Sequence, residues 1–326
     1  MRAVRFERLG PAAEVLEVVD VATPEPGPGE VRVKIVYSGV NPTDWKSRSG
    51  STARPRSGFQ IPHHDGSGVI DAVGEGVDQR RVGQRVWLYL AAAGRPWGTA
   101  AEWSVVPERQ AVPLPDGASF ELGASLGIPA LTAHRCLFAD GDVAALPVLV
   151  SGGAGAVGHF AIELAKRAGA RVIATVSGDA KAALARSAGA DLVVNYRDAG
   201  ALDQIRVFAE RVARVVEVNL AVNLSLDLEL SGPQTVIVAY AADAPDPTLP
   251  VRACMTANVM LRFVLLYTMP VDAVDRAVAE VNDALAAGAL TELPVHRFPL
   301  EQCAAAHDAV QSGAVGKVLL HIGDAS

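Results

Sequence analysis

Residues 148–158 have the sequence V-L-V-S-G-G-A-G-A-V-G, and this stretch decides the fold of the chain. A short β-branched run ends in glycines spaced G-x-G-x-x-G, and an alanine-rich segment of helical character follows. In the order strand, turn, helix, one glycine serves the turn, one the close approach of a pyrophosphate, and one the packing of helix against strand. N–H groups at a helix N-terminus also favour an anion. The residues expected at a dinucleotide here are Gly153, Gly155, Ala156, Val157 and Gly158.

The composition is that of an ordinary globular chain and limits its partners. Its 326 residues are too many for one small core, so we expect two domains. The formal net charge is −7 and no basic block occurs, which argues against nucleic acid as the main partner. The longest apolar stretch near the end of the chain, residues 259–267, is interrupted by Arg262 and is too short to span a bilayer. The N-terminus has no apolar secretion segment, so we expect a cytoplasmic protein that does not bind membranes.

Three cysteines are scattered through the chain, at Cys136, Cys254 and Cys303. None of them forms a C-x-x-C pair, the spacing typical of zinc and redox motifs. We therefore expect reduced and mostly buried thiols rather than a disulfide framework.

The first 120 residues indicate an irregular all-β domain. Short alternating or β-branched runs are separated by turns rich in Gly and Pro, a pattern typical of a partly open barrel. We expect its strands at residues 31–37, 68–73, 85–90 and 101–106.

From residue 122 onward, alanine-rich helical segments alternate with short aliphatic runs. This alternation is typical of βαβ units, so we expect an α/β domain with a doubly wound parallel sheet. Ligands of such sheets bind across the carboxyl ends of the strands. We expect the strands at residues 148–151, 171–176, 191–194, 215–218 and 235–239.

The run from Val259 to Tyr267 suits the edge strand of that sheet, because it is dense in Val, Leu and Phe. An exposed apolar edge promotes association between chains, so we expect a homodimer that pairs through this strand. Beyond it we expect helices at residues 271–287 and 301–311, and a last strand at residues 316–322.

Several separate segments of the chain resemble one known family. They are S-G-V-N-P-T-D at residues 38–44, I-P-H-H-D-G-S-G-V-I-D-A-V-G at 61–74, G-I-P-A-L-T-A at 127–133, G-A-D-L-V-V-N-Y-R at 189–197 and G-K-V-L-L at 316–320. With the glycine loop, their order and spacing resemble the medium-chain dehydrogenase/reductase superfamily, and within it the zeta-crystallin-like quinone oxidoreductases. The resemblance implies a GroES-like substrate domain at residues 1–121 and 271–326, and a Rossmann dinucleotide-binding domain at residues 122–270.

The resemblance allows a test for a catalytic metal. Zinc-dependent members place cysteine, histidine and cysteine where this chain has Asn41, His64 and Ile128. A catalytic zinc needs about three protein ligands and an open position, and Asn and Ile cannot replace thiolates. The four-cysteine structural zinc lobe is also missing from the sequence, because no cysteine precedes Cys136. We therefore expect no metal, with His64 and His63 as hydrogen-bonded pocket or core residues.

The end of the second Rossmann strand distinguishes NADPH from NADH. NAD-preferring Rossmann folds keep an acidic residue there for the ribose 2′-OH, whereas this chain has Ser177. Lys181 and Tyr196 match a lysine and a tyrosine with which zeta-crystallin-like members bind the cofactor, although an exposed helix lysine and a packed aromatic are the alternatives. Asp179 counts against a phosphate. We expect NADPH, with Lys317 near the pyrophosphate by resemblance or solvated at the end of its strand.

Hydride transfer is the chemistry of the nicotinamide, so the protein has to position donor and acceptor and steady the developing charge. The resemblance implies that Asn41 orients the nicotinamide ribose and that Thr132 lies near the nicotinamide amide; a satisfied loop amide and a helix threonine are the alternatives. Many zeta-crystallin-like members have a tyrosine where this chain has Lys46. Lys46 is either a catalytic donor to an oxyanion or a surface lysine paired with Asp44. Trp45 is expected to pack or to line the pocket.

The resemblance implies an NADPH-dependent reductase of a quinone or of another electron-poor α,β-unsaturated carbonyl compound. An enoyl or alkenal reductase is the nearest alternative, because D-W-K at residues 44–46 replaces the tyrosine loop. A non-catalytic NADPH-binding protein of the crystallin kind is the third hypothesis. We expect loops at residues 47–60 and 91–99 to form the acceptor pocket.

Overall fold

The computed structural model describes residues 1–52, 58–242 and 246–324. Part of the expected pocket loop, residues 53–57, lies outside the described residues. Within these ranges we find no helix that combines the length and the apolar character needed to cross a membrane.

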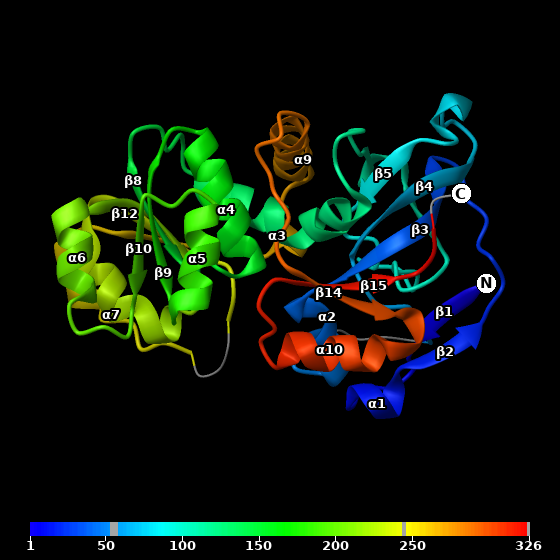
Figure 1. The fold of residues 1–326 in the computed structure, drawn as a ribbon, viewed down its shortest axis with the longest axis horizontal. Helices are drawn as coiled ribbons and strands as arrows, with labels where there is room; N and C mark the ends of the chain where they lie inside the picture. The colour runs from blue at the N-terminus through cyan, green and yellow to red at the C-terminus, as the bar shows by residue number, and fades with distance from the viewer. Residues whose placement is uncertain (53–57, 243–245, 325–326) are drawn as a thin grey trace. The chain divides into compact units, whose positions relative to one another are not determined.

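Two compact units make up the structure (Figure 1). Unit 1 comprises Met1–Ile128 and Glu292–Ser326, and unit 2 comprises Pro129–Thr291. The division after Ile128 falls inside helix α3 (Phe120–Phe138). The functional domain boundaries expected at 121/122 and 270/271 stay predictions.

Unit 2 contains a six-stranded sheet in the order β10-β9-β8-β11-β12-β13, in which all neighbours are parallel. If β8 is numbered as the first strand of this sheet, the order is 3-2-1-4-5-6, which is that of a doubly wound sheet. The strand order reverses between β8 and β11, which is the switch point. The prediction of an α/β sheet is confirmed. The strands are β8 (Pro147–Ser151), β9 (Arg171–Val176), β10 (Leu192–Asn195), β11 (Val212–Glu217), β12 (Ser231–Ala239) and β13 (Met260–Phe263). The helices after α3 are α4 (Ala156–Arg167), α5 (Asp179–Ser187), α6 (Ala201–Phe208), α7 (Leu220–Leu230), α8 (Val251–Ala257) and α9 (Val271–Ala286).

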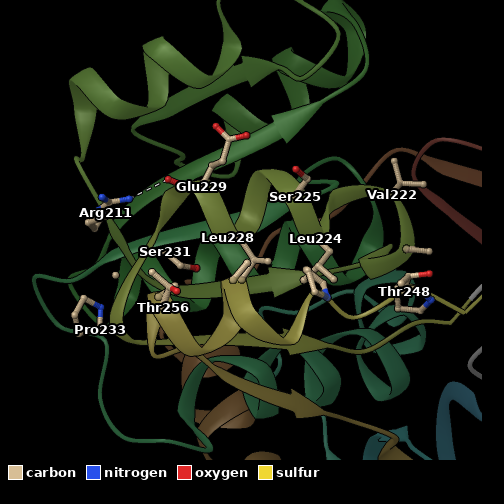
Figure 2. Close-up of a pocket in the computed structure, with 16 residues that line it drawn as sticks. Arg211, Val222, Leu224, Ser225, Leu228, Glu229, Ser231, Pro233, Thr248 and Thr256 are labelled. Atoms are coloured by element: carbon tan, nitrogen blue, oxygen red, sulfur yellow. Dashed lines mark hydrogen bonds between the residues drawn. The ribbon is translucent and has the colours of Figure 1, made fainter.

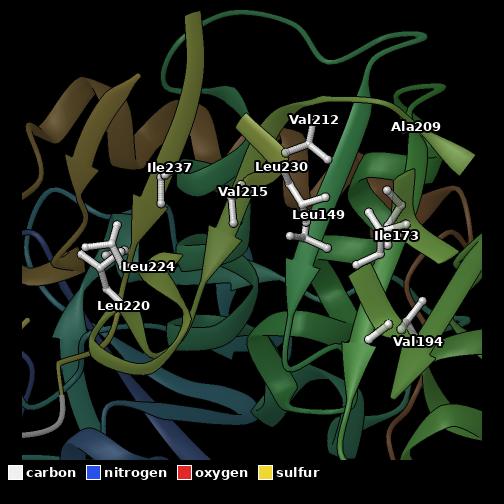
Figure 3. Packing of buried hydrophobic residues seen from close by; sticks show 13 residues of the cluster. Leu149, Ile173, Val194, Ala209, Val212, Val215, Leu220, Leu224, Leu230 and Ile237 are labelled. Atoms are coloured by element: carbon white, nitrogen blue, oxygen red, sulfur yellow. The ribbon is translucent and has the colours of Figure 1, made fainter. Parts of the chain in front are cut away.

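A row of aliphatic side chains packs this sheet against helices α6 and α7. The strand register aligns four buried residues, which therefore share one face: Ile237, Val215, Leu149 and Ile173. Figure 3 shows this row together with buried residues of α7, among them Leu220 and Leu224. Each fully buried aliphatic side chain contributes roughly 1.5–3 kcal/mol to stability. The packed sheet thus gives the loops at its strand ends a rigid base.

Unit 1 contains a seven-stranded sheet in the order β14-β15-β3-β4-β5-β7, with β6 also paired to β3. All its pairs are antiparallel except that of β14 with β15, which brings the C-terminal segment into the fold as the GroES-like prediction requires. The strands are β3 (Glu30–Val40), β4 (Asp65–Val73), β5 (Arg85–Leu88), β6 (Trp103–Pro107), β7 (Ala111–Pro113), β14 (Val295–Pro299) and β15 (Lys317–His321), and β1 (Arg2–Arg5) pairs with β2 (Glu17–Asp20) in a separate sheet. The helices are α1 (Ala12–Val15), α2 (Pro42–Ser49) and α10 (Cys303–Gln311), with 3-10 turns at Gln79–Arg81, Glu108–Gln110 and Leu300–Gln302.

Helix α2 corrects the expectation of an all-β region before residue 120. Asn41 is its N-cap, and Pro42 occupies the first helical position, where no backbone N–H is needed. Asp44 Oδ2 accepts a 2.7 Å hydrogen bond from the Asn41 backbone N–H, which ties down the first turn. The segment expected to be a loop after N-P is therefore a helix, and residues 44–46 lie on it.

Strand β13 forms the edge of the parallel sheet, as predicted, but it is shorter than the run at residues 259–267. The chain leaves the sheet after Phe263 and forms a 3-10 turn at Leu266–Thr268. Three apolar side chains on or near this edge are exposed, Met260 by 48%, Phe263 by 72% and Leu265 by 53%.

Candidate functional site

The glycine loop joins β8 to α4, and the space around each glycine indicates its role. A Cβ at Gly158 would lie 2.4 Å from the carbonyl oxygen of Gly152, and one at Gly153 would lie 2.8 Å from Ala174 Cβ. These two glycines therefore allow helix and strand to approach each other. A Cβ at Gly155 would meet only the Gly152 oxygen, at an ordinary 3.4 Å. Packing therefore does not require a glycine at position 155, which is expected where the missing side chain serves the close approach of a ligand.

The sharp turn of this loop uses a glycine outside the G-x-G-x-x-G spacing. Gly152 has a φ of 71°, in the left-handed region, and its carbonyl oxygen accepts from the Gly155 N–H at 3.0 Å. None of the three spaced glycines has a positive φ. Gly153 also lies in this turn, but the residue in it that needs the left-handed conformation is Gly152.

Ser177 and Lys181 lie together at the end of β9. Lys181 Nζ donates to Ser177 Oγ at 3.0 Å, so the ammonium group lies beside the neutral residue that replaces the acid of NAD-binding proteins. Tyr196 follows β10, is 47% exposed, and donates its backbone N–H to the Val176 carbonyl at 3.1 Å. The three predicted residues thus gather at the ends of two neighbouring strands.

Arg197 is a cation of this region that the sequence analysis missed. Its Nη1 lies 3.5 Å from the carbonyl oxygen of Ser177, and its guanidinium carbon lies 5.7 Å from the ring centre of Tyr196. Its position directly after Tyr196 was the available signal. Asp179 is exposed in the first turn of α5, where the helix N-terminus itself favours a carboxylate.

A cavity of about 510 Å³ lies at the carboxyl ends of β12 and β13 in unit 2. Strand ends are where ligands of doubly wound sheets bind. Its lining includes Asn219, Ala239, Tyr240, Phe263 and Leu265, none of which was predicted as a site residue from the sequence. Thr132 is buried on α3 and is not among the residues that line it.

A larger hollow, of about 900 Å³, lies between α7 and α8 (Figure 2). Leu224 and Leu228 of α7 and Thr256 of α8 line it, and Arg211 at its rim donates to the Glu229 carbonyl at 3.0 Å. Its lining, among the residues that the structure describes, includes none of the predicted site residues. Size alone therefore does not mark the functional site.

Two buried carboxyl groups interact beside the switch point of the sheet. Glu217 ends β11 and accepts from Asn223 Nδ2 at 2.9 Å, and the same amide donates to Ser151 Oγ at 3.0 Å. Burial raises the pKa of Asp227 on α7, and the neighbouring Glu217 charge raises it further. The pKa of Glu217 is also raised by burial. Asp227 therefore keeps its proton at neutral pH.

In unit 1, Asn41 belongs to a buried polar network with Asp65 and Lys317. Asn41 Nδ2 donates to Asp65 Oδ2 at 2.7 Å, and Lys317 Nζ donates to Asn41 Oδ1 at 2.7 Å. Lys317 Nζ also lies 3.7 Å from Asp65 Oδ2, and both charged residues are almost fully buried. Burial raises the pKa of Asp65 to about 6, opposed by the Lys317 charge, and burial lowers the pKa of Lys317. Lys317 is therefore not the solvated strand-end lysine that was one expectation.

The positions that match zinc ligands in relatives hold a different set of groups here. The backbone N–H of Ile128 donates to Asp65 Oδ1 at 2.9 Å, and the Asn41 amide is bonded to Lys317. His64 is 8% exposed, as expected for a pocket or core residue. A divalent cation at Asn41 would meet the Lys317 ammonium, so the donor set does not fit zinc.

Lys46 lies half-buried on α2, with its Nζ 5.8 Å from the centre of the Trp45 ring. Asp44, the residue that one expectation pairs with Lys46, is buried, and its Oδ2 accepts from the Asn41 backbone N–H. The packing role expected for Trp45 agrees with this contact.

His63 belongs to a hydrogen-bond chain in the core of unit 1. Thr99 Oγ1 donates to the Asp65 carbonyl at 2.5 Å, so its oxygen accepts from Ser38 Oγ at 2.7 Å. Ser38 in turn accepts from His63 Nδ1 at 2.8 Å, which leaves His63 Nε2 to accept from His307 Nε2 at 2.9 Å. Burial holds the pKa of His63 well below its usual range and lowers that of His307 to about 3. Both rings are therefore neutral.

The three cysteines are free thiols, as predicted. Cys136 and Cys303 are buried and Cys254 is partly buried. Cys303 Sγ lies 3.9 Å from His63 Nε2, but the hydrogen bond from His307 already uses that nitrogen.

Comparison with known proteins agrees with this architecture. Residues 27–116 match the family model of the alcohol dehydrogenase GroES-like domain, and residues 156–283 match that of the zinc-binding dehydrogenase. The quinone oxidoreductase of Lama guanicoe is 32% identical over 327 residues, which cover 98% of this chain and 97% of that protein.

Two solved structures share the fold over almost the whole chain. An NAD-dependent alcohol dehydrogenase is 29% identical with a TM-score of 0.90, covering 99% of this chain and 100% of that one. A mycobacterial protein complexed with NADPH is 30% identical with a TM-score of 0.85, and the coverage is again 99% and 100%. The chain therefore belongs to the medium-chain dehydrogenase/reductase superfamily and, within it, to the quinone oxidoreductase family.

Proposed function

We propose that the protein is an NADPH-dependent oxidoreductase that transfers a hydride to a quinone or another electron-poor α,β-unsaturated carbonyl compound, without a metal. The observation that carries the cofactor choice is the contact of Lys181 Nζ with Ser177 Oγ at the end of β9. An ammonium group beside a neutral residue attracts a 2′-phosphate, and Arg197 adds a second cation. The mycobacterial relative solved with NADPH supports the same choice.

The glycine loop is the proposed binding site of the pyrophosphate. The backbone near Gly155 leaves room for a ligand, and α4 begins at the next residue, so its N-terminus favours an anion. Ala156 and Val157 are in the first turn of this helix and are proposed to offer their N–H groups, and the half-exposed Tyr196 is the proposed contact for the adenosine end. When bound, NADPH supplies the hydride, and the protein supplies position and electrostatics.

Asn41 is the proposed contact for the nicotinamide ribose. Its amide nitrogen keeps one N–H beyond the one that donates to Asp65, while its oxygen accepts from Lys317 and, in the capping box of α2, from the Asp44 backbone. From the family resemblance we assign Thr132 to the nicotinamide amide, and Lys46 to donating a hydrogen bond to the oxyanion that forms on the acceptor.

The metal-free part of the proposal rests on charge. Asn41 and Ile128 stand in positions of thiolate ligands, and the Lys317 ammonium lies 2.7 Å from the Asn41 oxygen. Stoichiometric zinc in the purified protein, lost together with activity on chelation, would contradict it.

We also propose a homodimer that pairs through β13. This strand is the edge of the sheet in the described chain, and the apolar side chains of Met260, Phe263 and Leu265 lie exposed on or beside it. A second copy of the strand would cover them. A monomeric mass in light scattering at micromolar concentration would contradict this assembly.

An acceptor screen followed at the nicotinamide absorbance tests the proposed reaction. We expect NADPH to be consumed with quinones and enones, and NADH to be used at least about tenfold less efficiently, because the 2′-phosphate contacts are lost. Comparable efficiency with both cofactors would contradict the cofactor assignment. Turnover confined to enoyl or alkenal substrates would favour carbon–carbon double-bond reduction, and binding without oxidation would favour a non-catalytic binder.

A further inference from the structure

Three polar side chains from distant parts of the chain meet inside unit 1. Asn41 follows the end of β3, Asp65 begins β4 and Lys317 begins β15. Both β4 and β15 run antiparallel to β3 and flank it, and the register places their first residues beside its last ones. The topology of the sheet therefore brings a lysine and an aspartate to opposite sides of one asparagine.

The two charged groups select one of the two possible orientations of the Asn41 amide. The ammonium of Lys317 can bind only the amide oxygen, and the ionised carboxylate of Asp65 can bind only the amide N–H. Both contacts measure 2.7 Å and are charge-assisted, which makes them stronger than neutral hydrogen bonds. The second N–H of the Asn41 amide consequently points in a fixed direction.

We propose that Lys317 and Asp65 are positioning residues that hold the Asn41 amide ready for the nicotinamide half of the cofactor. The inference rests on the proposed function, because it takes Asn41 as the contact for the nicotinamide ribose. It replaces the expectation that Lys317 binds the pyrophosphate. Lys317 acts on the cofactor through Asn41 and does not touch it.

The surroundings of the pair support a dedicated arrangement. Lys317 is 2% exposed and Asp65 is fully buried. A Cβ at Gly127 would lie 2.2 Å from Asp65 Oδ1, so only glycine lets helix α3 approach the carboxylate and donate the Ile128 N–H to it. Asp44 and His63 are the other titratable groups near Lys317, and the neutral His63 adds no charge. A buried ion pair is often replaceable by apolar residues without loss of stability, so stability alone gives little reason to keep one.

The test compares two ligands that differ only in the nicotinamide half. NADPH carries the whole cofactor, whereas adenosine 2′-phosphate 5′-diphosphate carries the 2′-phosphate and the diphosphate but neither the nicotinamide nor its ribose. Calorimetric titration of Lys317→Met should show NADPH affinity lowered about tenfold, the worth of one charge-assisted hydrogen bond. Affinity for the nucleotide fragment should change by less than about twofold. An equal loss for both ligands would mean that Lys317 touches the diphosphate and would overturn the inference, as would no loss of NADPH affinity.

A double-mutant cycle separates positioning from a direct contact. If Lys317 acts through Asn41, then adding Lys317→Met to Asn41→Ala should change NADPH affinity by less than about twofold. A full additional loss in that background would overturn the inference.

Removal of one charge leaves the other buried and unpaired, so Lys317→Met can fail to fold. The variant Lys317→Met/Asp65→Asn removes both charges together and should give the same pattern with the two ligands. Lys166→Met is the matched control, because it removes a lysine paired with Asp191 in unit 2 and should leave both affinities unchanged. If the wild-type protein binds neither ligand, the proposed function itself fails, whatever the variants do.

Discussion

Substitution of single glycines in the loop after β8 should separate ligand binding from folding. In Gly155→Ala the new Cβ makes an ordinary 3.4 Å contact with the Gly152 oxygen, so the free energy of unfolding should fall by about 1 kcal/mol or less. The same methyl group would stand where we propose that the pyrophosphate approaches the backbone. NADPH affinity should therefore fall at least about tenfold, which corresponds to about 1.4 kcal/mol.

Gly158→Ala should behave in the opposite way. Its Cβ would lie 2.4 Å from the Gly152 oxygen and 2.9 Å from Gly153 Cα, and these are backbone atoms that cannot rotate away. Helix α4 has to shift from the strand, which costs about 1–3 kcal/mol of stability.

Urea unfolding and a fluorescence titration with NADPH measure the two effects. Gly117→Ala in unit 1 is the control, because its Cβ would meet nothing within 4 Å and neither quantity should change. Wild-type NADPH affinity in Gly155→Ala would refute the assignment of this glycine to the ligand.

Three further substitutions test single contacts. Lys181→Ala should lower NADPH affinity about tenfold and leave NADH affinity unchanged in parallel titrations; loss of NADH binding instead would refute its place at the 2′-phosphate. His307→Gln keeps a donor for His63 but cannot be protonated. Because burial lowers the pKa of His307 in the folded protein, only the unfolded chain binds a proton at this residue as the pH falls below about 6.5. The free energy of unfolding, measured with urea at pH 4–6, should therefore fall with decreasing pH up to about 1.4 kcal/mol per pH unit more steeply in the wild type than in the variant. Equal slopes would contradict this. Asp227→Asn should remove the opposite pH dependence of the free energy of unfolding. Because burial and the Glu217 charge raise the pKa of Asp227 in the folded protein, the unfolded chain loses this proton first, and the wild type should lose stability as the pH rises above about 4. The same pH profile in wild type and variant would contradict this.

The sequence was a good guide wherever one segment of chain carried a signal by itself. The strand, turn and helix around residues 148–158 predicted the doubly wound sheet, because the glycine spacing and the periods of the flanking runs are local properties. Ser177 and Lys181 are four residues apart and meet within one βα unit, so their contact also followed from the local order.

Groups that meet only through the topology could not be predicted in the same way. Asp65 and Lys317 are 252 positions apart in the chain, and only the order β15-β3-β4 brings them to Asn41. The chain of hydrogen bonds from Thr99 to His307 is equally non-local. Helix α2 was missed for a different reason: the N-cap, proline and acid at its start were present, but a helix of eight residues shows little periodicity.

The measurement that tests the central claim most directly is the catalytic efficiency of quinone reduction by the chelator-treated enzyme, with NADPH and with NADH. We predict that activity survives removal of metal and that NADPH is preferred by at least about tenfold. Activity that disappears on chelation and returns with zinc, or an equal or higher efficiency with NADH, would contradict the account.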